Sequence, residues 1–154
     1  MASPFPFTSG QVLTAAQLNS ISDAVAFTPT WTSGLTVGNA TEEWYYFEIN
    51  DLVVVRGQTV LGSTSSVSGN PTMTLPVTRN TFAGGVVRIG YGELGDAGAA
   101  TYTSIVISTN TTNAIFFAEN AGVSYLREAS VSASIPFTWT TSDFIGGTMI
   151  YKAA

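Results

Sequence analysis

The sequence predicts an all-β protein, an antiparallel β-sandwich or jelly roll behind a short N-terminal arm that contains one helix. From residue 28 onward, short segments rich in Val, Ile, Thr and aromatic residues alternate with clusters of Gly, Asn, Ser and Pro. Helical spacing of apolar residues occurs clearly only once, near the N-terminus. Many short strands separated by turn signals favour a sandwich or jelly roll over an α/β fold. We therefore expect an attachment arm at residues 1–27 and a β-sandwich domain at residues 28–154.

The expected helix begins with a capping pattern. Thr14 and Gln17 have the spacing at which each side chain satisfies a free backbone N–H of the first helical turn. From there to about Val25, apolar residues recur at intervals of three and four, which places them on one face. A helix of about three turns is marginal alone, so this face is expected to dock on the β domain or on neighbouring subunits. The candidate contact residues are Leu13, Leu18, Ile21 and Val25.

The remaining elements are expected to be strands. Asn50 and Asp51 form a tight turn between the first two, which should pair as a hairpin. The predicted strands are Trp44 to Ile49, Leu52 to Leu61, Thr72 to Leu75, Val86 to Gly92, Thr101 to Ile107, Ala114 to Ala118 and Thr148 to Lys152.

The composition restricts the partners of the chain. Hydrophobic residues make up 45% of it and charged residues 10%, against about 25% charged residues in a typical soluble domain. No apolar run approaches the roughly 20 residues that span a bilayer, so membrane insertion is not expected. We expect part of the apolar surface to be buried between copies of the chain. The net charge is -5 and the five basic residues are scattered, which argues against nucleic-acid binding.

The sequence also argues against catalysis. The absence of His and Cys removes nucleophile–imidazole pairs, thiolate sites and the commonest general base. The dinucleotide-like pattern Gly90 to Gly95 leads into a predicted strand instead of the helix that such a site requires. Glu42 and Glu43 are adjacent and would point to opposite faces of a strand. We expect no enzyme activity, no cofactor and no metal; calcium would be the most suitable ion, but no loop has EF-hand spacing.

Two segments are candidates for surface recognition. Trp44 to Phe47 would place aromatic rings on both sides of a strand, either in a core or subunit contact or as a platform for a sugar. Gly62 to Pro71 is rich in Ser and is expected to be a flexible surface loop, or an exposed tip that contacts a host glycan or a neighbouring subunit. The candidate recognition residues are Trp44, Tyr45, Tyr46, Ser65 and Ser66.

The sequence contains six further stretches of interest: Phe5 to Asn19, Phe27 to Asn39, Gly62 to Ser66, Leu75 to Val77, Phe137 to Phe144 and Ile150 to Tyr151. Together they resemble small bacteriophage appendage proteins of the minor tail, head-fibre or capsid decoration type. The resemblance implies a virion protein whose arm anchors it to the particle and whose β domain is displayed, commonly as a trimer. It implies no catalytic residues.

The expected function is that of a structural virion protein, a homotrimer whose first assignment is minor tail protein. A capsid decoration or head-fibre protein is the alternative, and a glycan-binding recognition module is the second. Expected partners are other copies of the chain, tail or capsid proteins and, for the recognition alternative, a host glycan. The segment Met1 to Phe7 lacks the basic and apolar regions of a signal peptide, so synthesis in the host cytoplasm and display on the virion surface are expected.

Overall fold

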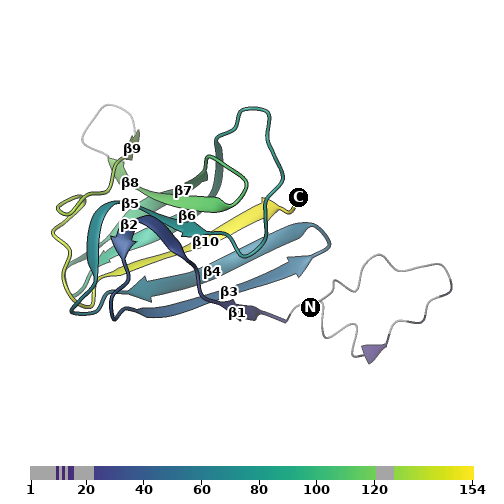
Figure 1. Ribbon diagram of the computed structural model, residues 1–154, viewed down its shortest axis with the longest axis horizontal. Coiled ribbons are helices and arrows are strands. Elements are labelled where there is room, and N and C mark those ends of the chain that lie inside the picture. Colours follow the sequence, from purple (N-terminus) through teal and green to yellow (C-terminus); the bar gives the residue numbers. More distant parts are fainter. Residues whose placement is uncertain (1–9, 11, 13, 16–22, 121–126) are drawn as a thin grey trace.

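The fold consists of β-strands. A computed structural model describes residues 23–120 and 127–154, together with Gly10, Val12, Thr14 and Ala15. Within these residues the chain forms ten strands (Figure 1), which confirms the all-β prediction. The strands are β1 (Val25–Phe27), β2 (Trp31–Thr36), β3 (Thr41–Ile49), β4 (Leu52–Val60), β5 (Ser66–Thr74), β6 (Val87–Asp96), β7 (Ala100–Ser108), β8 (Asn113–Asn120), β9 (Arg127–Ala129) and β10 (Phe144–Lys152).

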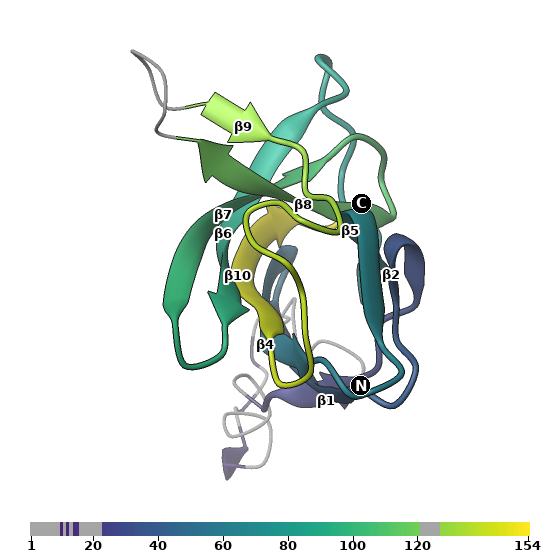
Figure 2. The same ribbon diagram turned by 90° about the vertical axis from the view of Figure 1, so that its left-hand side faces the viewer.

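The strands form one continuous antiparallel sheet. Their order is β1-β3-β4-β10-β6-β7-β8-β5-β2, and β9 pairs with β8. The sheet curls into a half-barrel, so that β5 and β2 at one end lie opposite β10 and β4 (Figure 2). The expected β-sandwich or jelly roll is not confirmed. Strand patterning shows which residues face inward but not whether a sheet divides into two or curls on itself, and accumulated strand twist favours curling.

Aromatic side chains hold the two ends of the sheet together. Trp31 of β2 and Trp44 of β3 lie with their ring centroids 6.4 Å apart, although these strands are far apart in the sheet order. The Trp31 indole N–H also donates to Glu42 Oε1 at 2.7 Å. Phe116 of β8 packs against both tryptophan rings, at 6.0 and 6.3 Å. These contacts close the interior of the half-barrel.

A row of glycines on the inner face makes room for these rings. Trp44 pairs with Gly57 on β4, Gly57 with Gly147 on β10, and Gly147 with Gly92 on β6. A Cβ on Gly57 would lie 2.7 Å from the Trp44 ring, and Cβ atoms on Gly92 and Gly147 would lie 3.2 and 3.3 Å from Phe116. The large rings therefore lie over a strip of sheet that carries no side chains.

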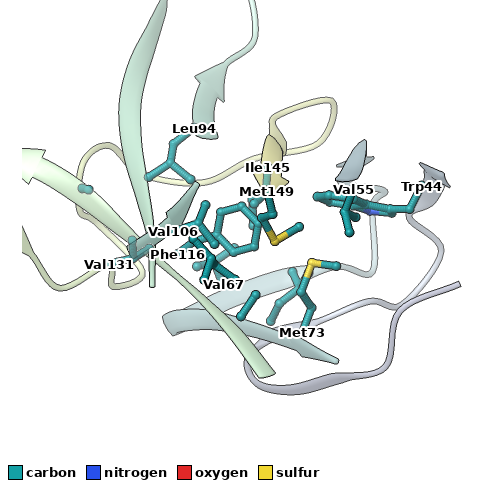
Figure 3. Packing of buried hydrophobic residues seen from close by; sticks show 14 of the residues in the cluster. Trp44, Val55, Val67, Met73, Leu94, Val106, Phe116, Val131, Ile145 and Met149 are labelled. Carbon is teal, nitrogen blue, oxygen red and sulfur yellow. The ribbon is translucent and has the colours of Figure 1, made fainter. Parts of the chain in front are cut away.

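The hydrophobic core fills the rest of the concave face (Figure 3). Its members come from strands at both ends of the sheet order. Burial of their apolar surface therefore stabilises the curled form of the sheet. The residues labelled there are Trp44, Val55, Val67, Met73, Leu94, Val106, Phe116, Val131, Ile145 and Met149.

The predicted strands overlap observed strands, and the Asn50–Asp51 hairpin is confirmed by the pairing of β3 with β4. β1, β2 and β9 were not predicted. The prediction of a loop over Gly62 to Pro71 is wrong in its second half, because β5 begins at Ser66. Val67, within this Ser-rich stretch, is buried in the core. The low complexity of this stretch therefore concealed the start of a strand whose buried apolar residues include Val67 and Met73.

Most of the predicted helix, with Leu13, Leu18 and Ile21, lies outside the described residues. Its expected last residue, Val25, lies instead in β1 and pairs with Tyr46, so the helix prediction is wrong at that end. Among the described residues only Ala15 has a helical assignment, and no helix is formed as an element. The ring of Phe27 packs against Trp44 and Tyr46. These contacts stabilise residues 25–27 as a strand at the edge of the sheet. None of the described residues belongs to a helix that is long and apolar enough to cross a membrane.

Candidate functional site

The outer face of the sheet carries a groove of about 760 Å³ over β3, β4, β10 and β6. Strand register aligns outward-pointing residues in rows across these four strands, since alternate side chains point to opposite faces. All four residues of the central row are exposed, and a tyrosine stands at each end, with exposed fractions of 48% for Tyr45 and 58% for Tyr91. In order across the sheet it consists of Tyr45, Arg56, Thr148 and Tyr91.

A second row runs beside the first and is polar. Its third position is Gly146, so only backbone atoms line the groove at that point. A Cβ on Gly146 would lie 3.3 Å from Gln58 Cβ and 3.2 Å from the Gly57 carbonyl oxygen, a tight fit. The row consists of Glu43, Gln58, Gly146 and Glu93.

The opposite end of the same face is mainly apolar, although Lys152 of β10 pairs with Leu52 in its last row. Ile150 of β10 is 54% exposed and Leu52 of β4 is 45% exposed, and both face solvent beside the β3–β4 turn. Register joins them to outward-facing neighbours on β3 and β4. We call this surface the apolar strip, and its members are Phe47, Ile49, Leu52, Val54 and Ile150.

The polar side chains of the groove lack partners within the described part of the chain. Among the described residues, the side chains of Glu43, Arg56, Gln58 and Glu93 make no hydrogen bond and no ion pair. Tyr91, by contrast, is flanked by Arg88, whose guanidinium carbon lies 5.8 Å from the ring centroid. Arg88 in turn lies 3.6 Å from Glu128. The groove therefore offers free donors and acceptors between two exposed rings.

The carboxylates do not form a catalytic pair. Glu43 on β3 and Glu93 on β6 are three strand spacings apart, or about 14 Å along the sheet, whereas glycosidase carboxylates lie roughly 5–9.5 Å apart. Asp143 is buried and accepts a hydrogen bond from the Ala97 backbone N–H at 2.9 Å. Glu42 is engaged with Trp31. No three acidic side chains of the described residues come together as metal ligands.

The structure separates the three predicted aromatic recognition residues. Trp44 is 1% exposed and donates from its indole N–H to Thr59 Oγ1 at 2.9 Å, so it is unavailable to a ligand. Tyr46 is half-buried, with its ring 5.8 Å from that of Phe27. Only Tyr45 lies on the outer face with its side chain exposed, and it lines the groove.

Ser65 and Ser66 do not line the groove. Ser65 Oγ accepts a hydrogen bond from the Gly62 backbone N–H at 3.0 Å and donates to the Val37 carbonyl oxygen. Asn39 also holds the turn, since its side-chain oxygen accepts from the Thr64 backbone N–H at 2.9 Å. Ser66 is exposed at the start of β5. The turn before β5 is thus tied to the β2–β3 turn.

Sequence reasoning missed most of the groove. Arg56, Gln58, Tyr91 and Glu93 were not singled out, although alternation along β4 and β6 could have placed each of them outward. The missing information was strand order. β10 comes from the C-terminal end of the chain and inserts between β4 and β6.

In comparisons with known proteins, no family model, no curated protein and no solved structure matches this chain.

Proposed function

We propose that the chain is a non-enzymatic structural subunit of a bacteriophage particle, a minor tail protein displayed on the virion surface as a homotrimer. The phage assignment rests on the resemblance of the N-terminal segment and the Thr- and Gly-rich stretches to phage appendage proteins. The assembly assignment rests on the apolar strip, which is the observation that carries the proposal.

The apolar strip is suited to contact between subunits. Its residues are contiguous through strand register on the outer face of the sheet, so they present one continuous patch. Contiguous exposed apolar patches typically mark interaction sites, because leaving them in water forfeits the free energy of burial. In a cyclic trimer each copy would place this patch against a different surface of its neighbour. The contact would then bury apolar surface that is exposed in the single subunit.

The test compares two equally exposed apolar residues. Leu52 in the strip and Ile135 in the segment before β10 are both 45% exposed. Leu52→Glu should convert the trimer to a species of the 16.1 kDa subunit mass in light scattering, because a charge in a subunit contact is costly to desolvate. Ile135→Glu should leave the trimer intact.

A wild-type chain that is monomeric at micromolar concentration would refute the assembly proposal, as would equal behaviour of the two variants. Electron microscopy of particles with labelled subunits tests the location. Label at the tail supports a minor tail protein, and label over the head would replace it with a capsid decoration or head-fibre protein.

A further inference from the structure

We propose that the groove over β3, β4, β10 and β6 binds a neutral oligosaccharide. This inference goes beyond the structural role proposed above and does not depend on it. The polar and aromatic rows that carry it contain no residue of the apolar strip, although Phe47 and Val54 of the strip also line the groove.

The two tyrosines provide stacking surfaces. Tyr45 and Tyr91 stand at the two ends of one row, on β3 and β6, and the two residues are 48% and 58% exposed. An exposed aromatic ring offers an apolar face to the C–H surface of a sugar while its hydroxyl remains available for a hydrogen bond. Three strand spacings place the two backbones about 14 Å apart, a span for a short oligosaccharide rather than one sugar ring.

The polar row supplies hydrogen-bonding groups of both kinds. Carboxylates of Glu43 and Glu93 accept, the guanidinium of Arg56 donates, and the amide of Gln58 does both. Sugar hydroxyls also donate and accept, so they complement such a mixture. Because none of these side chains has a partner among the described residues, a ligand need not break existing contacts to reach them. Gly146 lies between Gln58 and Glu93 in this row and has no side chain to occupy the groove.

The charge of the groove favours a neutral ligand. Two carboxylates and one guanidinium line it, and the whole chain carries a net charge of -5. An anionic glycan or a phosphate group would therefore meet unfavourable electrostatic potential.

The backbone argues against an extended peptide as the ligand. A peptide commonly binds by adding a strand to an open sheet edge. Here β4, β10 and β6 are each paired on both sides, and β3 is covered by β1 along Trp44–Tyr46. The central strands of the groove thus present side chains and no free backbone edge.

The test uses the full chain and defined probes. Isothermal titration calorimetry with cellohexaose, maltohexaose, mannohexaose and hexa-N-acetylchitohexaose is compared with titration of hexagalacturonate. We expect at least one neutral hexasaccharide to bind and the anionic one not to bind. Tyr45→Ala and Tyr91→Ala should each weaken binding about tenfold without lowering the melting temperature substantially.

Phe82→Ala is the matched control. Phe82 is an exposed aromatic residue, at 44%, that does not line the groove, and its removal should leave the affinity unchanged. The proposal is overturned if no neutral probe binds at millimolar concentration, if both tyrosine variants bind like the wild type, or if hexagalacturonate binds more tightly. Light scattering of the tyrosine variants keeps the two proposals separate, because loss of binding by an intact trimer concerns the groove alone.

Discussion

Replacement of Trp44 by Ala should destabilise the protein by about 3–5 kcal/mol, the range for truncating a buried large aromatic side chain. The ring is 1% exposed and packs against Phe27, Trp31 and Phe116 at centroid distances of 6.3 to 6.5 Å. Because Gly57 has no side chain, nothing beneath the ring can fill the space that Ala would leave. A cavity should therefore remain, and cavities add to the lost transfer free energy.

The Trp44→Phe variant separates packing from hydrogen bonding. Phe keeps most of the ring contacts but loses the indole N–H that donates to Thr59 Oγ1. The net contribution of one such hydrogen bond is about 1 kcal/mol, so this variant should lose roughly 1–2 kcal/mol once the smaller ring is included.

Urea and thermal unfolding followed by circular dichroism measure both variants. At about 2–4 °C per kcal/mol for a chain of this size, Trp44→Ala should melt about 6–20 °C lower than the wild type. Tyr45→Ala is the control, because the neighbouring side chain lies on the outer face, and it should cost less than about 1 kcal/mol. The reasoning is refuted if Trp44→Ala stays within 1 kcal/mol of the wild type or if Tyr45→Ala is the more damaging change.

Three further predictions concern the fold. Burial raises the pKa of Tyr151, whose hydroxyl donates to the Val77 carbonyl oxygen at 2.9 Å. Above about pH 10 the tyrosine ionises in the unfolded chain but stays protonated in the folded one. The free energy of unfolding should therefore fall as the pH rises. Tyr151→Phe should flatten that fall in unfolding titrations at pH 9–11, and an unchanged slope would contradict the assignment. Arg79→Met should lower the free energy of unfolding by about 3 kcal/mol or more, measured by urea unfolding. The reason is that the buried guanidinium donates to Ser108 Oγ and to the carbonyl oxygens of Asn80 and Gly85. Arg79→Lys should be destabilised as well, since Lys lacks the planar group of donors that Arg has. Deletion of residues 1–27 removes β1 and should lower the melting temperature more than deletion of residues 1–22 does. Equal melting temperatures of the two truncated chains would exclude a structural role for β1.

The local parts of the fold could be predicted because their causes are local. Asn50 adopts a φ of 58°, a conformation that Asn tolerates, and the turn joins two strands whose apolar alternation is visible in the sequence. The candidate site was predicted less well. Of the aromatic residues from 44 to 46, the sequence showed that neighbours point to opposite faces, but not which of them faces the core.

By itself, the sequence determined the all-β class, most strand positions, the β3–β4 hairpin and the alternation that sets Tyr45 and Trp44 on opposite faces. The tertiary structure decided the rest. Which face is buried depends on glycines of other strands, since Gly57, Gly147 and Gly92 come into one row only when β10 pairs with both β4 and β6. The same pairing assembles the groove from residues as far apart as Glu43 and Thr148. Pairing between distant strands is selected by burial of the whole core, a cooperative free energy that no short segment of sequence contains.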